Sequence, residues 1–169
     1  MMRKLPSWPG HVRLNFYAVR RQIKVKITLE LPINKPRAEV WKAFDDPQKM
    51  KIWQPSLISF EPVSGVPGQP GSVSKLTYKE NEREFVLIER ITRREEPNGF
   101  DGVYENNFAD NKIVNKFIEQ GKDQTLWVME TEFKFKTFIM RILGPLMKKN
   151  IIARTRKDMQ RFKEMAESL

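Results

Sequence analysis

The chain has 169 residues, a length that fits one globular domain and is too short for two well-packed ones. Its residues are 40% hydrophobic and 31% charged, which is typical of a globular protein. It contains no cysteine, which excludes disulfides and thiolate metal sites and makes a reducing, cytoplasmic setting the expectation. No segment approaches the roughly 18 consecutive apolar residues that a membrane-spanning helix needs.

The charge is unevenly distributed. The formal net charge is +10, from 31 basic and 21 acidic residues. Residues 1–21 contain basic side chains and no acid, so we expect a basic N-terminal extension ahead of a single domain over residues 22–169. The basic residues of this extension are Arg3, Lys4, Arg13, Arg20 and Arg21.

The domain begins with a predicted strand and two short helices. Apolar and polar side chains alternate over Gln22–Leu31, which is typical of a half-buried strand. Pro32 is expected to end this strand, and Asn34 is a plausible N-cap for a helix that reaches Phe44. A second short helix is predicted over Pro47–Trp53, because proline is favoured in a first helical turn.

The middle of the chain is typical of antiparallel β structure. We predict strands at Leu57–Val63, Val73–Lys79, Arg83–Arg94, Phe100–Phe108, Ile113–Glu119 and Thr125–Lys136. The segments between them contain turn residues, including a glycine-rich turn at residues 65–71 and a turn at Asp110-Asn111. Helical spacing then predicts a long helix over about residues 145–167, with Gly144-Pro145 breaking or kinking it near its start.

This order of elements resembles the helix-grip fold of the Bet v 1-like, START-related (SRPBCC) superfamily, which includes polyketide cyclase/dehydrase-like and lipid-transfer proteins. The resemblance spans about residues 22–167. The segments that carry it are Ile27–Pro36, Val40-Trp41, Asp46-Pro47, Trp53–Pro55, the turn at residues 65–71, Thr125–Trp127 and Arg161–Glu167. It implies an α+β domain in which a curved antiparallel sheet of about seven strands wraps around the long C-terminal helix. The resemblance also implies that the two short helices lie between strands 1 and 2 and that a cavity lies between the sheet and the long helix.

Strand parity predicts which side chains face this cavity, because alternate residues point to opposite faces of a sheet. Such pockets are mostly apolar, with a few polar groups that orient the ligand. The alternative for each of these residues is ordinary core packing. The candidate cavity residues are Trp53, Leu76, Tyr78, Tyr104, Asn106, Phe108, Phe117, Trp127, Met129, Phe133, Met147 and Ile151.

Several kinds of catalytic site lack their residues. His11 is the only histidine and lies outside the expected domain, so neither a Ser-His-Asp nor a Cys-His site is predicted. Carboxylates alone seldom bind zinc, and neither a metal nor a cofactor is expected. Glu89 is the candidate acid-base residue, since a carboxyl on an apolar strand face has a raised pKa. Its alternative is a surface glutamate paired with a neighbouring Lys or Arg.

Three hypotheses follow for function. The first is a non-catalytic protein that binds a small hydrophobic molecule such as a lipid, polyketide or aromatic metabolite, with transport of that molecule as a further role. The second is a cyclase, dehydratase or hydrolase-type enzyme that uses Glu or Tyr acid-base groups. The third is an interaction module with a basic surface, for which the basic C-terminal helix suggests contact with an anionic membrane rather than specific binding of nucleic acid.

Overall fold

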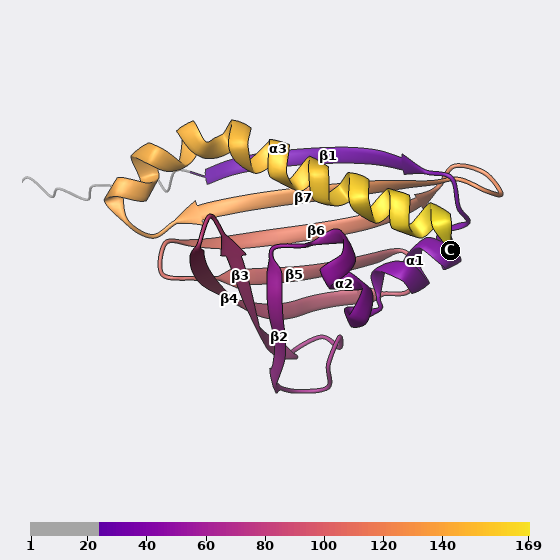
Figure 1. Cartoon of the computed structure of the whole chain (residues 1–169), viewed down its shortest axis with the longest axis horizontal. Helices are drawn as coiled ribbons and strands as arrows, with labels where there is room; N and C mark the ends of the chain where they lie inside the picture. Colours follow the sequence, from indigo (N-terminus) through magenta and orange to yellow (C-terminus); the bar gives the residue numbers. More distant parts are fainter. Residues whose placement is uncertain (1–23) are drawn as a thin grey trace, which may run out of the picture.

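The structure is a computed structural model that describes residues 24–169, so the expected basic extension and the first two residues of the predicted first strand lie outside the described residues. One antiparallel sheet contains seven strands in the order β1-β7-β6-β5-β4-β3-β2 (Figure 1). Their bounds are β1 Lys24–Ile33, β2 Leu57–Ser64, β3 Val73–Glu80, β4 Arg83–Glu95, β5 Gly99–Glu105, β6 Ala109–Glu119 and β7 Thr125–Phe135.

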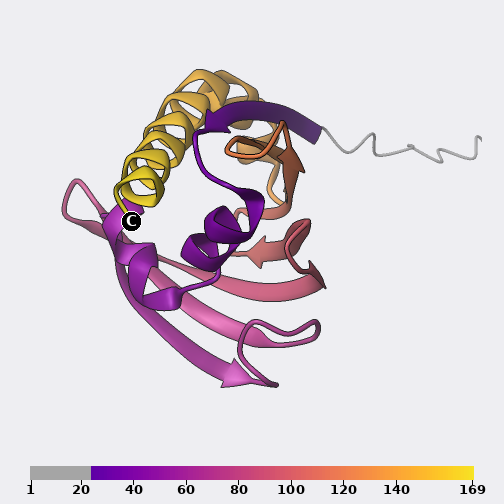
Figure 2. The ribbon, with the colours of Figure 1, turned by 90° about the vertical axis from the view of Figure 1, so that its right-hand side faces the viewer.

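Three helices accompany the sheet. Two short ones, α1 (Arg37–Phe44) and α2 (Pro47–Trp53), connect β1 to β2, and the long α3 (Phe138–Ser168) ends the chain. Figure 2 shows that the sheet is strongly curved and that the helices lie on its concave side. This arrangement confirms the prediction of an α+β helix-grip fold with about seven strands.

Aromatic side chains fill one end of the space between sheet and helices. Phe44 of α1 is at their centre, and its ring centroid lies 5.0–6.0 Å from those of five other rings. These aromatic neighbours are Trp53, Phe100, Phe117, Trp127 and Phe162. Aromatic pairs at such spacings add to the free energy gained from burial alone, so this end of the interior is a packed core.

The junction between β1 and α1 differs from the prediction. The strand continues through Pro32 to Ile33. β1 is an edge strand and pairs with β7 alone. Proline is tolerated in an edge strand because its nitrogen, which lacks a hydrogen, can face away from the sheet. Asn34 is not the N-cap, and α1 begins only at Arg37 after Pro36. The Asn34 side chain instead accepts a hydrogen bond from Gln124.

The turn between β5 and β6 also corrects the prediction. It lies at residues 106–108 rather than at Asp110-Asn111, both of which belong to β6. The Asn106 side-chain oxygen accepts hydrogen bonds from the backbone N–H groups of Phe108 (2.8 Å) and Ala109 (2.9 Å). A short amide side chain that bonds its own backbone two residues on stabilises a turn.

The long helix begins earlier than predicted. The Thr137 hydroxyl accepts a hydrogen bond from the Met140 N–H (3.2 Å) and caps α3, which runs through Pro145 without interruption in the helical assignment. Gly144 is buried, and a Cβ atom placed on it would lie 2.1 Å from the Phe135 ring. The glycine therefore allows close approach of α3 to β7.

Candidate functional site

A cavity of about 470 Å³ lies between the concave face of the sheet and α3. Side chains from β3 to β7 form one wall, α3 from Met140 to Met159 forms another, and α2 closes the end next to the aromatic core. Volumes of about 300–1,000 Å³ are typical of sites for small organic molecules. Four lining residues are also exposed to solvent and mark the mouth of the cavity: Phe108, Met147, Asn150 and Arg154.

A row of polar side chains crosses the sheet inside the cavity. Glu89 of β4 is paired in register with Tyr104 of β5, and Tyr104 is paired with Asn111 of β6. All three line the cavity. The Thr131 hydroxyl donates a hydrogen bond to the Asn111 side-chain oxygen, so Asn111 is oriented by the neighbouring strand β7.

Glu89 is the most unusual of these groups because it is only 4% exposed. No ion pair involves it among residues 24–169. Burial raises the pKa of its carboxyl, and a hydrogen bond from Tyr104 opposes that rise. The structure therefore places Glu89 in the cavity rather than on a solvated face, although the sequence left both alternatives open.

Burial also raises the pKa of Tyr104 well above its usual value, and the nearby Glu89 charge and hydrogen bond act in the same direction. The phenol consequently stays protonated at neutral pH and donates to the carboxyl. A carboxyl held beside a phenol in an apolar cavity can accept a proton from a ligand, donate one to it, or hold it by hydrogen bonds.

The part of the cavity near β3 contains a second set of polar groups. The Tyr78 hydroxyl donates to Gln54 Oε1 (2.8 Å), and the Tyr78 ring stacks on Phe85 with 5.4 Å between centroids. Arg154 of α3 pairs with Glu80, and its guanidinium carbon lies 5.9 Å from the Phe85 ring centroid. These contacts connect the β3–β4 hairpin to α3 beside the mouth.

One acid of α3 adds to this polar lining. Asp158 pairs with Arg161 at 2.9 Å. Burial raises the pKa of its carboxyl, although Arg154 and Arg161 both lower it.

The structure brings most of the sequence-predicted cavity residues together. Ten of the twelve line the cavity: Trp53, Leu76, Tyr78, Tyr104, Asn106, Phe108, Met129, Phe133, Met147 and Ile151. Asn106 and Phe108 reach it from the β5–β6 turn rather than from a strand.

Phe117 and Trp127 are not among the residues that line the cavity. Both belong to the aromatic core, with their rings stacked at 6.0 Å. The Trp127 indole N–H donates to Asn115 Oδ1 (3.0 Å). Their strand parity is that of cavity residues, but Phe44 and the other aromatic rings fill the space in front of them.

Other lining residues were not predicted from the sequence. Asn111 was assigned to a turn, and Gln54 follows a short helix whose orientation the sequence does not define. Arg154 and Asp158 are polar residues of α3, whereas the cavity residues predicted on that helix, Met147 and Ile151, are both apolar. The helical period that places Ile151 at the cavity also brings Arg154, three residues on, and Asp158, seven residues on, near the same side of the helix.

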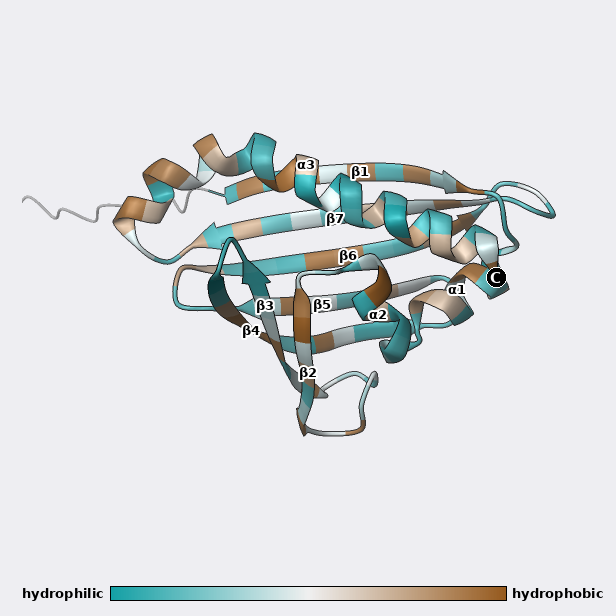
Figure 3. Cartoon of the chain, in the orientation of Figure 1, coloured by the Kyte–Doolittle hydropathy of each residue, from teal (hydrophilic) through white to brown (hydrophobic). Residues whose placement is uncertain are grey.

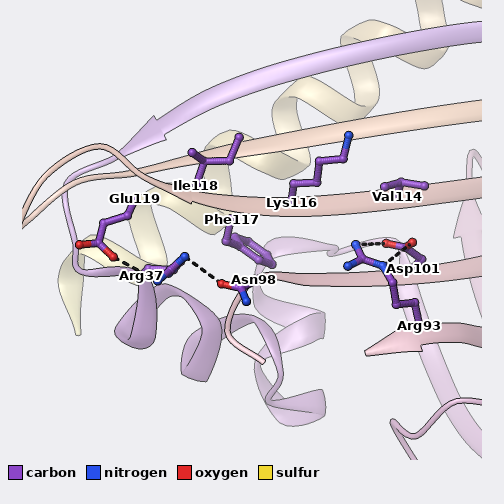
Figure 4. Close-up of a pocket in the computed structure, with 9 residues that line it drawn as sticks. All are labelled: Arg37, Arg93, Asn98, Asp101, Val114, Lys116, Phe117, Ile118 and Glu119. Atoms are coloured by element: carbon purple, nitrogen blue, oxygen red, sulfur yellow. Dashed lines mark hydrogen bonds and ion pairs between the residues drawn. The ribbon is translucent and has the colours of Figure 1, made fainter. Parts of the chain in front are cut away.

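A second hollow, of about 670 Å³, is an open depression on the outer face of the sheet (Figure 4). Each of its charged side chains takes part in an ion pair. Arg37 contacts Glu119 (3.1 Å) and Asn98 (2.8 Å), and Arg93 makes two hydrogen bonds to Asp101 (2.9 and 3.0 Å). The interior cavity, where Glu89 forms no ion pair with any of residues 24–169, is the stronger candidate for a ligand site.

Residues 24–169 contain no group of three or more His, Cys, Asp or Glu side chains that could hold a metal ion. No helix within the same range is long and apolar enough to cross a membrane.

Known structures with the same architecture share little sequence with this chain. No protein-family model and no curated protein matches the sequence. Ara h 8.0201 superposes with a TM-score of 0.71 at 18% identity, covering 86% of this chain and 99% of that one. A START superfamily protein from Mycobacterium smegmatis gives a TM-score of 0.71 at 13% identity, covering 85% and 97%. Norcoclaurine synthase from Thalictrum flavum, in complex with dopamine and hydroxybenzaldehyde, gives 0.64 at 15% identity, covering 97% and 96%.

At these identities the likeness concerns the fold and leaves the ligand open. The superpositions span 85–97% of this chain and 96–99% of the matched chains. The chain therefore has the helix-grip fold of Bet v 1-like and START-like proteins.

Proposed function

We propose that the protein binds a small hydrophobic molecule in the cavity between the sheet and α3. The observation that carries this proposal is a cavity of about 470 Å³ whose mostly apolar wall holds two adjacent polar groups, the buried Glu89 and the half-buried Tyr104. Apolar surface provides the affinity of such sites, and a few polar groups orient the ligand.

The polar groups define one end of the ligand. Glu89, Tyr104 and Asn111 form a row on the sheet, so a hydroxyl, carbonyl or amine placed against β4–β6 finds both donors and acceptors. Trp53 adds a buried indole N–H without a hydrogen-bond partner among residues 24–169. The opposite wall, which includes Met140, Met147 and Met159, is apolar and adaptable in shape.

The proposal can be tested by placing a larger side chain in the cavity from strand β4. Leu87 lines the cavity, and its neighbour Val86 points away from it, with 40% of its surface exposed. We expect Leu87→Trp to weaken binding of the neutral fluorescent probe Nile red by about tenfold or more, which is about 1.4 kcal/mol. Val86→Trp is the matched control and should bind like wild type. Equal binding by a folded Leu87→Trp variant would contradict the proposal.

A second candidate function is acid-base catalysis on the bound molecule, and the burial of Glu89 favours it. A desolvated carboxylate is a stronger base than one in water. Nitrobenzisoxazole tests this directly, because a base that removes its ring C–H proton breaks the ring N–O bond and releases a coloured cyanophenolate. We expect Glu89→Gln to abolish any acceleration of this reaction, and Glu84→Gln, at an exposed position of β4, to retain it. A rate independent of Glu89 would exclude this residue as the base.

A further inference from the structure

The first ten residues of α3 expose an unusual number of large apolar side chains. Six of them have 44–75% of their surface exposed, and Figure 3 shows the hydrophobic colouring of this end of the helix. We call this set the apolar patch. Its members are Phe138, Ile139, Ile142, Leu143, Leu146 and Met147.

The patch occupies one side of the helix. At roughly 100° per residue, the six positions fall within about half of the helix circumference. The other side faces the protein, since Gly144 is buried against Phe135 and Met140 lines the cavity. Exposed apolar surface gathered in this way on a helix marks an interaction site.

Basic side chains surround the patch. The segment from Lys134 to Lys157 contains eight Lys and Arg residues and no acid. Two of them are paired within residues 24–169, Lys136 with Asp110 (2.6 Å) and Arg154 with Glu80. The other six are Lys134, Arg141, Lys148, Lys149, Arg156 and Lys157, and none takes part in an ion pair with another residue of that range.

The patch lies next to the cavity mouth. Phe108, which is 57% exposed, belongs to the β5–β6 turn, and its carbonyl accepts a hydrogen bond from the Lys136 N–H (2.9 Å) just before α3. Phe108 and Met147 both line the cavity. A partner surface that covers the apolar patch therefore also contacts the mouth of the cavity.

We propose that the apolar patch and its surrounding cations dock the cavity mouth on an anionic lipid bilayer. An amphipathic helix with Lys and Arg around an apolar face binds at the boundary between headgroups and acyl chains. Anionic headgroups neutralise the unpaired cations, and the acyl region buries the apolar side chains.

Charge also distinguishes the bilayer from other occupants. A second copy of the chain would meet the patch through the same surface, as two-fold interfaces do, and would bring two sets of cations together. A nucleic acid would neutralise the cations through its phosphates and leave six apolar side chains exposed to water. An anionic bilayer satisfies both features.

Co-sedimentation of the full chain with vesicles tests the proposal. We expect binding to vesicles that contain phosphatidylserine, weak binding to pure phosphatidylcholine, and a loss of binding as salt is raised. Replacing two patch residues, in the double variant Phe138→Ser with Leu146→Ser, should weaken phosphatidylserine binding by about tenfold or more, because each buried side chain contributes through its apolar area.

The matched control replaces two exposed valines away from α3. Val63 and Val66 are 61% and 68% exposed, on β2 and in the turn that follows it. Val63→Ser with Val66→Ser should bind vesicles like wild type. If the control weakens as much as the patch variant, or if the patch variant binds as tightly as wild type, the proposal is wrong. The second result would also follow if the five cations of residues 1–21 were the only contact.

Two readouts distinguish bilayer docking from ligand binding in the cavity and from self-association. Phe138 and Leu146 do not line the cavity, so uptake of Nile red without vesicles should be unchanged in the patch variant. Loss of vesicle docking with intact uptake would therefore leave the ligand site standing. Analytical ultracentrifugation provides the other readout, because a wild-type dimer that the patch variant converts to a monomer would overturn the bilayer in favour of self-association.

Discussion

Glu89 of β4 and Tyr104 of β5 form a registered cross-strand pair whose side chains both line the cavity. The carboxyl is 4% exposed and has a phenol rather than a cation as its neighbour. This relationship has a consequence for stability that can be measured without knowing the ligand.

The contribution of Glu89 to the stability of the protein should fall as pH rises. Burial raises the Glu89 pKa in the folded state, so the folded protein holds this proton at pH values where the unfolded chain has released it. Its contribution is complete below the unfolded pKa and is lost as pH rises through the folded pKa. The loss is at most about 1.4 kcal/mol per pH unit between the two values.

Urea denaturation of wild type and Glu89→Gln between pH 5 and pH 8 measures this effect. The free energy of unfolding should fall more steeply with pH in wild type than in the variant, which cannot ionise at that position. Other acids, including Asp158, titrate equally in both proteins and cancel in the comparison. Parallel pH profiles would show that Glu89 ionises normally.

Gly144→Ala should destabilise the protein, although Ala normally favours a helix over Gly by about 1 kcal/mol. The added Cβ would lie 2.1 Å from the Phe135 ring, and forcing an extra methyl group into a packed site costs about 1–3 kcal/mol. Thermal unfolding provides the measurement, with Lys157→Ala on the exposed side of α3 as the control. A rise in melting temperature for Gly144→Ala would contradict the observed packing.

Asn106→Ala should lower stability by about 1–2 kcal/mol, because the side-chain oxygen accepts two backbone hydrogen bonds in the β5–β6 turn. The neighbouring Asn107 is exposed and makes no side-chain hydrogen bond within residues 24–169. Asn107→Ala therefore serves as the matched control and should have little effect in the same denaturation experiment. Equal losses in both variants would show that the turn depends on something other than the Asn106 amide.

Trp127→Phe should lower stability by about 1–3 kcal/mol and leave Nile red binding unchanged. The substitution removes the indole N–H that donates to Asn115 and leaves a buried acceptor unsatisfied, yet Trp127 does not line the cavity. Denaturation and probe titration of the same variant separate the two effects. A folded variant with weakened binding would place Trp127 at the ligand.

Much of the fold could be predicted because its signals are local. The alternation predicted over Gln22–Leu31 includes Val25, Ile27 and Leu29, which are buried, and the second short helix predicted over Pro47–Trp53 is α2. The errors occurred where a tertiary or side-chain contact outweighs a local preference. Pro32 remains within β1 because this strand lies at the edge of the sheet. The β5–β6 turn lies at residues 106–108 instead of Asp110-Asn111, because the Asn106 side chain bonds the backbone there.

The cavity was harder to predict because parity assigns a face and does not show what fills the space in front of it. Trp127 and Met129 share a face of β7, but only Met129 reaches the cavity, since aromatic rings from α1 and α3 cover Trp127. Glu89 was ambiguous because apolar residues occur on both faces of β4.

Native mass spectrometry of the full chain, purified without denaturation from its own organism, tests the ligand site most directly. The account predicts that wild type and Val86→Trp retain a small hydrophobic molecule that Leu87→Trp has lost. Retention of the same molecule by a folded Leu87→Trp variant, or a bare chain mass for all three proteins, would contradict it.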